Sequence, residues 1–147
     1  MSPPTATDSP GVPGALRILV IDDEPGVRDI LSELLTEEGH DVAIAPDGVA
    51  GLALFSERSF DLVITDLTMP QMSGLAVVLE VRRLAPCAVC ILTSGWTERP
   101  VPGGLDVSVA DMVLQKPFQF DQVLDSVKRA GELHHQRIAA TVARHGT

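Results

Sequence analysis

Short runs of apolar, mostly β-branched residues recur along this chain, and each run ends abruptly at polar side chains. The first run, ILVI at residues 18–21, stops at Asp22. Such a run is typical of a strand that is covered on both faces of a sheet. The segment from Pro25 to Gly39 instead repeats its apolar residues at helical spacing. Strands that alternate with helices predict βαβ units, and therefore a doubly wound α/β domain with a five-stranded parallel sheet.

The predicted elements alternate along the whole chain. We expect strands at Arg17–Ile21, Asp41–Ala45, Asp61–Thr65, Ala88–Thr93 and Asp111–Gln115. Helices are expected from Pro25 to Gly39, from Asp47 to Glu57, after the turn-rich stretch 69–74 to about Leu84, and from about Phe120 onward. The segment 98–104 is rich in Pro and Gly, so the fourth helix, between the last two strands, should be short, irregular or absent.

Three parts of the chain differ in composition. Residues 1–15 hold four prolines and several small polar residues, and we expect a flexible leader there. The domain is predicted to span residues 16–131. Residues 132–147 form a C-terminal tail, in which the apolar Ile138 and Val142 favour an extension of the last helix and would suit a homodimer in which final helices pair.

The charge of the chain excludes several partners. Its 147 residues include 20 acidic side chains against 11 Lys and Arg, which gives a formal charge of -9. That sign opposes binding to a phosphate backbone, so we expect no direct contact with nucleic acid. The sequence shows neither a signal peptide nor a stretch long enough to span a membrane, which predicts a cytoplasmic protein without membrane contact. The four histidines stand apart from the acidic strand ends and are expected to be solvated.

Polar side chains follow four of the predicted strands where these strands end. Because the carboxyl ends of parallel strands meet at one edge, we expect these side chains to converge there. They are Asp22, Asp23, Glu24, Asp66, Thr93, Ser94 and Lys116. Carboxylates that crowd together repel one another unless a cation lies among them, and hard oxygen ligands suit Mg²⁺ or Mn²⁺. An alternative for Asp22 and Asp23 is that they only cap the following helix.

Four motifs in this order resemble those of a known family. They are ILVIDDEP at the first strand, DLVITDLTMPQMSG at the third, ILTSGW at the fourth and VLQKPF at the fifth. From about Arg17 to Arg129 the chain is similar to the receiver domain of bacterial two-component response regulators. The resemblance implies a flavodoxin-like fold with strand order 2-1-3-4-5. The residues that match these motifs are therefore expected to have the roles that the family assigns to them.

The resemblance implies that Asp66 is the phosphoacceptor, which takes a phosphoryl group from a phosphohistidine. Asp23 and Asp66 would hold Mg²⁺ directly, Asp22 would reach it through water, and the backbone carbonyl of Thr68 would complete the ligands. Lys116 would bond a phosphoryl oxygen. These roles agree with a transition state that needs positioning and charge neutralisation more than covalent help.

A hydroxyl of the fourth strand is expected to swing toward the phosphoryl group and to shift the conformation. We favour Ser94, because a serine before Gly and an aromatic residue resembles a common family variant, and Thr93 is the alternative. The sequence departs from the family at Val113, where a Tyr or Phe that couples to this hydroxyl is usual. The output mechanism therefore differs from the usual one.

The sequence thus predicts a stand-alone receiver: a signalling switch with self-directed phosphotransfer and autophosphatase activity only. Its expected partners are a sensor histidine kinase or a histidine phosphotransfer protein, and a downstream protein target. A phosphorelay intermediate, a phosphate sink and a non-phosphorylated interaction module of the same fold are alternatives. A phosphohydrolase of the haloacid dehalogenase type is disfavoured, because it would need an Asp where Thr68 stands. A nucleotide-binding domain is disfavoured because the loop after the first strand is acidic.

Overall fold

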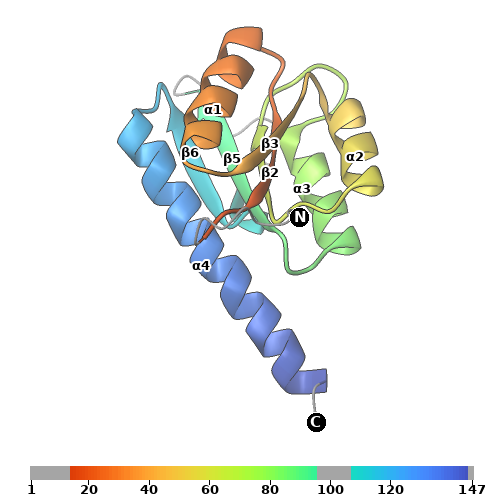
Figure 1. Cartoon of the computed structure of the whole chain (residues 1–147). Helices are drawn as coiled ribbons and strands as arrows, with labels where there is room; N and C mark the ends of the chain where they lie inside the picture. The colour runs from red at the N-terminus through yellow and green to blue at the C-terminus, as the bar shows by residue number, and fades with distance from the viewer. Residues whose placement is uncertain (1–13, 96–106, 146–147) are drawn as a thin grey trace.

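One parallel sheet organises the molecule. The structure, a computed structural model, describes residues 14–95 and 107–145. Its five strands lie in the order β3-β2-β4-β5-β6, which confirms the predicted order 2-1-3-4-5 and the doubly wound fold (Figure 1). The strands are β2 (Arg17–Ile21), β3 (Asp41–Ala45), β4 (Leu62–Asp66), β5 (Val89–Gly95) and β6 (Met112–Lys116).

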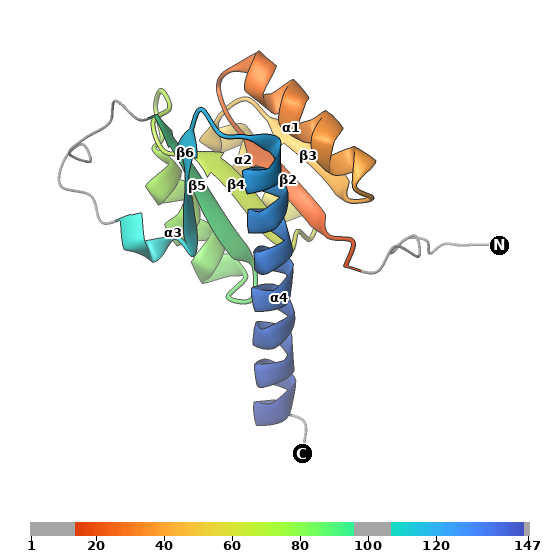
Figure 2. The ribbon, with the colours of Figure 1, turned by 90° about the vertical axis from the view of Figure 1, so that its left-hand side faces the viewer.

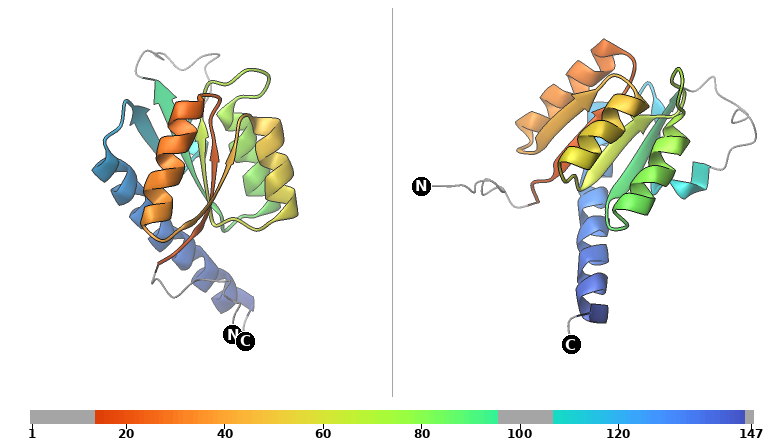
Figure 3. Two further views of the ribbon diagram at one scale, coloured as in Figure 1. Left: turned by 45° about the horizontal axis from the view of Figure 1, so that its top comes forward. Right: turned by 90° about the vertical axis from the view of Figure 1, so that its right-hand side faces the viewer.

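Helices cover both faces of the sheet. The helices α1 and α4 lie on one face, and α2 and α3 lie on the other, as the views in Figures 2 and 3 show. Their bounds are α1 (Pro25–Glu37), α2 (Gly48–Glu57), α3 (Gly74–Leu84) and α4 (Phe120–His145). Local signals explain where they begin and end: Asp47 caps α2 by accepting the Ala50 amide at 2.8 Å, and Gly39 follows α1 with a φ of 96°.

The two helical layers give two hydrophobic clusters. On the α1 and α4 side, residues of β2 and β4 such as Ile18 and Ile64 pack against Leu31, Leu35 and Val127. On the other side, Leu19 and Val63 belong to the cluster that contains Phe55 of α2 and Val78 of α3. Alternate strand residues therefore face opposite layers, as the period of two requires. This double burial explains why the strands are continuously apolar in the sequence.

Several strand ends differ from the predicted bounds by one or two residues. Asp66 and Lys116 are the last residues of β4 and β6, not the first residues after them, because each still pairs with β5. Asp66 lies opposite Thr93, and Lys116 lies opposite Gly95. The side chains of Asp66 and Lys116 therefore project from the sheet rather than from loops.

The final helix is long. It continues without interruption from Phe120 to His145, through most of the expected tail. The leader up to residue 13 and the segment 98–104, for which we expected a short or irregular helix, lie outside the described residues. A 3-10 helix, η2 (Val107–Val109), precedes β6. Within residues 14–95 and 107–145, no helix combines the length and the apolar character of a membrane span.

Candidate functional site

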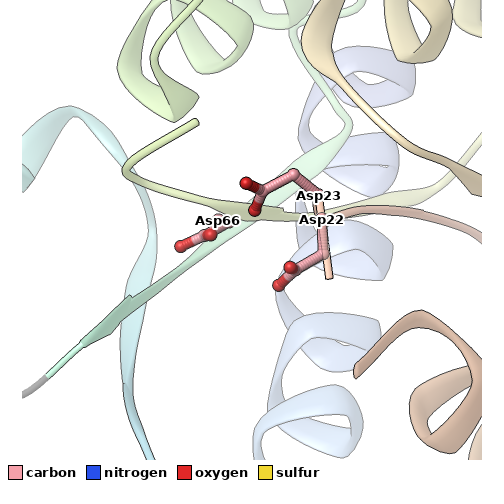
Figure 4. A group of neighbouring side chains, drawn as sticks. All are labelled: Asp22, Asp23 and Asp66. Carbon is pink, nitrogen blue, oxygen red and sulfur yellow. The ribbon is translucent and has the colours of Figure 1, made fainter. Parts of the chain in front are cut away.

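Three aspartates meet at the carboxyl edge of the sheet, where β2 and β4 end. Asp22 and Asp23 follow β2, and Asp66 ends β4. Figure 4 shows these side chains together at this edge. One carboxylate oxygen from each lies within 4.8 Å of those of the other two. Asp22 and Asp66 are buried, whereas Asp23 is exposed. Part of this group is therefore open to an incoming ligand.

Lys116 lies against the same group from the end of β6. Its Nζ is 3.0 Å from Asp22 Oδ2, 3.5 Å from Asp66 Oδ2 and 3.2 Å from Glu24 Oε1. Burial lowers the pKa of Lys116, but the hydrogen bond that Lys116 donates to Asp22 and the charges of Asp66 and Asp22 outweigh it, and the net pKa is raised. The ammonium therefore stays charged at neutral pH, and one cation faces several carboxylates.

The environment of Asp66 favours its neutral form. Burial is the largest cause, and it raises the pKa of this carboxyl from 3.8 to about 6, with further increases from the charges of Asp22 and Asp23. The charge of Lys116 acts in the opposite direction. A carboxylate with this pKa is ionised at neutral pH but costly to keep so, because its neighbours are also anionic. A cation at this point would relieve that cost, and hard carboxylate oxygens are suitable ligands for Mg²⁺.

This raised pKa predicts a measurable pH effect on stability. A carboxyl with a higher pKa in the folded chain contributes stability that is complete below its unfolded value and is lost as the pH rises through about 6. In EDTA at pH 8, the unfolding free energy of Asp66→Asn should therefore exceed that of the parent by about 2 kcal/mol, so that the variant unfolds at a higher denaturant concentration. At pH 4 the two proteins should unfold at nearly the same concentration.

Urea titrations at the two pH values test this expectation. Asp125→Asn is the matched control, because this aspartate lies on the exposed surface of α4. It should change the unfolding free energy little at either pH. An Asp66→Asn variant that gains no stability between pH 4 and pH 8 would show that burial does not penalise the charged form of Asp66.

The capping alternative for Asp22 and Asp23 is partly realised. The N-cap of α1 is Glu24, whose side chain makes no capping hydrogen bond. Asp22 Oδ1 accepts the Glu24 amide at 2.9 Å, so this aspartate does order the turn before the helix. Its other oxygen, Oδ2, forms the ion pair with Lys116 Nζ. Asp22 thus has both roles, and no cap is formed by either aspartate directly.

The fold and this group of side chains, together with one comparison with known protein families, identify the family of the chain. The model of the response regulator receiver domain matches residues 18–128. The chain belongs to this family. The acidic group and the lysine described above lie within these matched residues.

Relatives of known name agree with this assignment. The chain is 32% identical over 117 residues to the chemotaxis protein CheY of Bacillus subtilis, and the match covers 78% of this chain and 97% of CheY. It is 37% identical over 115 residues to the DNA-binding dual master transcriptional regulator RpaA of Synechocystis, where the match covers 76% of this chain and 47% of RpaA. The chain thus spans about half the length of RpaA and nearly all of CheY.

Solved structures are similar too. The response regulator protein TrrA from Thermotoga maritima, determined in complex with Mg(2+)-BeF, is 39% identical, has a TM-score of 0.69, and is matched over 78% of this chain and 97% of its own. A response regulator receiver domain protein from Clostridium thermocellum is 28% identical with a TM-score of 0.72, over 84% of this chain and 98% of its own. Receiver domains bind Mg²⁺ at an acidic pocket, and this chain has an aspartate group at the corresponding edge.

The two candidate hydroxyls of this receiver domain differ in burial. Thr93 is fully buried opposite Asp66 in the ladder, and its Oγ1 has no hydrogen-bond partner among the described residues. Ser94 lies one residue beyond this pair, is half-buried, and has its hydroxyl 3.3 Å from the Gly95 carbonyl oxygen. Ser94 is therefore the hydroxyl nearer to solvent.

Two other positions singled out in the sequence have exposed side chains. Thr68 is exposed in the loop after β4, two residues beyond Asp66. Val113, where the family usually has an aromatic residue, is 49% exposed on β6. No bulky side chain from this position covers the sheet next to β5, so a rotating aromatic ring is absent there.

A glycine that sequence reasoning placed only in a turn proves to lie against the site. Gly74 begins α3, and its amide donates to Leu67 O at 2.8 Å. A Cβ on Gly74 would come 2.2 Å from the backbone oxygen of Asp66. The start of α3 therefore rests directly on the backbone of the candidate phosphoacceptor. The motif DLVITDLTMPQMSG contains this glycine, but its spacing alone does not reveal the contact.

Proposed function

We propose that this receiver domain is a phosphorylation-dependent signalling switch that accepts a phosphoryl group on Asp66 and signals through a protein partner. The observation that carries the proposal is the position of Asp66: a buried carboxylate with two neighbouring aspartates within 4.8 Å and the Lys116 ammonium at 3.5 Å. The raised pKa of Asp66 and the burial of its carboxyl support its assignment as the nucleophile.

The phosphodonor in this proposal is a phosphohistidine on a sensor kinase or a phosphotransfer protein in the cytoplasm. One oxygen of Asp66 attacks the phosphorus, a phosphorus–oxygen bond forms, and the phosphorus–nitrogen bond to the histidine breaks with the electron pair returning to the ring nitrogen. The product on this chain is an acyl phosphate. Hydrolysis of that acyl phosphate by water regenerates Asp66, which gives the switch its return step.

The other residues bind and neutralise. Asp23, Asp66 and the Thr68 carbonyl would hold Mg²⁺ or Mn²⁺, with Asp22 reaching the ion through water, and the ion would neutralise charge on the transferring phosphoryl oxygens. Lys116 would donate to one of those oxygens from its position beside Asp66. The Ser94 hydroxyl, with Thr93 as the alternative, would turn toward the phosphoryl group after transfer. A protein partner then reads the altered surface.

A phosphorylation assay tests this function. Wild type incubated with acetyl phosphate and Mg²⁺ should gain one phosphoryl group by intact-mass spectrometry, whereas Asp66→Asn should gain none, because the amide is not a nucleophile toward phosphorus. EDTA should prevent the gain in wild type. The measurement should be repeated over time, since hydrolysis removes the group.

Asp47→Asn is a matched control for that assay. Asp47 also follows a strand, β3, but its carboxylate caps α2, and asparagine is an equally good cap. This variant should be phosphorylated like wild type. If wild type gains no mass where a known receiver domain does, or if Asp66→Asn gains as much as wild type, the proposed function is wrong. In the first case a non-phosphorylated interaction module becomes the better description.

A further inference from the structure

Carboxylates surround the ammonium group of Lys116. An ammonium has three N–H donors and no acceptor. Three carboxylate oxygens lie around Nζ: Asp22 Oδ2 at 3.0 Å, Glu24 Oε1 at 3.2 Å and Asp66 Oδ2 at 3.5 Å. The side chain of Lys116 is only 18% exposed, so water has little access to it. If Lys116 donates to a phosphoryl oxygen, as the proposed function requires, one of these carboxylates has to give up its place.

Two of the three carboxylates are held in place. Asp22 is 2% exposed, and its second oxygen accepts the Glu24 amide at 2.9 Å, so both of its oxygens are in use. Asp66 is 6% exposed at the end of β4, and in the proposed reaction it carries the phosphoryl group itself. A buried carboxylate that loses its cation pays the larger penalty, because water does not replace the cation there. Neither aspartate is therefore the one that leaves Lys116.

Glu24 is held differently. Its backbone is fixed at the start of α1, because its amide donates to Asp22 Oδ1 and its carbonyl accepts the amides of Val27 and Arg28 at 3.1 Å and 3.2 Å. Its side chain is 63% exposed and makes no capping hydrogen bond. Among the described residues, Lys116 is the partner of this carboxylate. The Glu24 side chain can therefore turn into water while its backbone stays where it is.

We propose that Glu24 is a positioning residue that occupies, in the unphosphorylated chain, the Lys116 donor that a phosphoryl oxygen takes over. This inference rests on the proposed function, because it assigns a further residue to the same reaction. When the phosphoryl group is transferred, one of its oxygens displaces the Glu24 carboxylate from Lys116, and no covalent bond of Glu24 forms or breaks. Glu24 thus stabilises the chain before transfer, but it stabilises neither the transition state nor the phosphorylated product.

The two directions of the switch should therefore respond differently to the loss of this contact. Phosphorylation starts with Glu24 on Lys116, so removal of the contact lowers its barrier. Hydrolysis starts with Glu24 already displaced, so its barrier does not depend on the contact. With Mg²⁺ at saturating concentration, Glu24→Gln should be phosphorylated by acetyl phosphate about fivefold faster than wild type, which is the strength of an exposed ion pair. Its aspartyl phosphate should decay at the wild-type rate.

Two further variants separate the contact from the charge. Glu24→Asp keeps the negative charge, but its side chain is one methylene shorter and does not reach Lys116 from the same backbone. It should also be phosphorylated faster than wild type, whereas a residue that only repels an anionic phosphodonor would leave it at the wild-type rate. Glu33→Gln is the matched control, because Glu33 is exposed on α1 nine positions after Glu24, about 13 Å along the helix. It should change neither rate.

A spectroscopic measurement follows Lys116 directly and does not depend on the rate of the reaction. The chain has two lysines, so labelling of lysine with ¹³C at Cε gives two signals, with Lys128 as the internal reference. In the unphosphorylated chain, Glu24→Gln should shift the Lys116 signal and leave that of Lys128 unchanged. With Mg²⁺ and beryllofluoride, an analogue of the phosphoryl group, this difference between the two proteins should largely disappear, because Glu24 has left the ammonium.

The failure of this inference can be distinguished from that of the proposed function. A wild type that gains no phosphoryl group overturns the proposed function, and the role of Glu24 falls with it. A wild type that is phosphorylated, with Glu24→Gln or Glu24→Asp no faster, overturns the role of Glu24 alone. Hydrolysis that accelerates as much as phosphorylation does so too. A Lys116 signal that is the same in Glu24→Gln, or a difference that persists in full with beryllofluoride, has the same consequence.

Discussion

Replacement of Lys116 by methionine is expected to slow the phosphorylation of Asp66 about 100-fold and, at the same time, to tighten the binding of Mg²⁺. The reason for the slower reaction is that Lys116 Nζ lies 3.5 Å from Asp66 Oδ2, where it can donate to a phosphoryl oxygen as negative charge accumulates. Methionine has a similar length, but it cannot donate. The loss is therefore electrostatic rather than steric.

The tighter metal binding has a different origin. Three carboxylates and one ammonium give this group a formal charge of -2, from three negative charges and one positive charge, and the variant leaves -3. A divalent cation is attracted more strongly by the second arrangement. Calorimetric titration with Mg²⁺ should therefore give a lower dissociation constant for Lys116→Met, although intact-mass time courses with acetyl phosphate give a lower rate.

Lys128→Met is the matched control for this variant. Lys128 is the second of the two lysines in the chain, and it lies on α4 in a pocket whose lining includes none of Asp22, Asp23 and Asp66. It should change neither quantity. If Lys116→Met binds Mg²⁺ more weakly than wild type, the lysine has a structural role at this edge. An unchanged rate of phosphorylation would show that Lys116 does not bind the phosphoryl group.

The convergence of the site could be predicted because it depends on topology alone. Parallel strands bring their carboxyl ends to one edge, so Asp22, Asp66 and Lys116 had to approach one another once the five strands were recognised. The strands were recognisable because both faces of the sheet are covered, which makes each of them an uninterrupted apolar run. Local composition and one topological rule thus carry most of the information about this edge.

Contacts between distant segments could not be predicted in the same way. His134 reaches Cys87 at a sequence separation of 47, and Arg137 reaches Asp111 at a separation of 26. Asp61, the other partner of His134, lies further away still in the sequence. No periodicity marks such partners, because their approach depends on how far α4 extends and on how it crosses the sheet. A histidine outside the acidic group was therefore expected to be solvated, and the structure shows that His134 anchors a helix.

The close approach of Gly74 to Asp66 was hidden for a related reason. A glycine after a serine at the start of a helix is typical of many turns, and the sequence gives no distance between it and the strand before it. In the structure, a Cβ at this position would lie 2.2 Å from Asp66 O and 2.9 Å from a methyl carbon of Leu92. The first of these contacts is with backbone, which cannot rotate away as a side chain can.

Gly74→Ala is therefore expected to destabilise the domain by about 3 kcal/mol, at the upper end of what overpacking costs, and to lower the midpoint of thermal unfolding by about 10 °C. Either α3 must move outward or the end of β4 must shift. Both changes displace Asp66, so phosphorylation by acetyl phosphate should also be slower at temperatures where the variant is still folded. Thermal unfolding followed by circular dichroism and the intact-mass assay measure the two effects.

Gly26→Ala provides a control with the opposite sign. Gly26 lies in the first turn of α1, and a Cβ there would meet nothing within 4 Å. Alanine has the higher helix propensity and restricts the unfolded chain, so this variant should be more stable than wild type by up to about 1 kcal/mol. If Gly74→Ala behaves like Gly26→Ala, the contact between α3 and the Asp66 backbone is loose. A large loss at Gly74 alone would show that the start of α3 sets the position of Asp66.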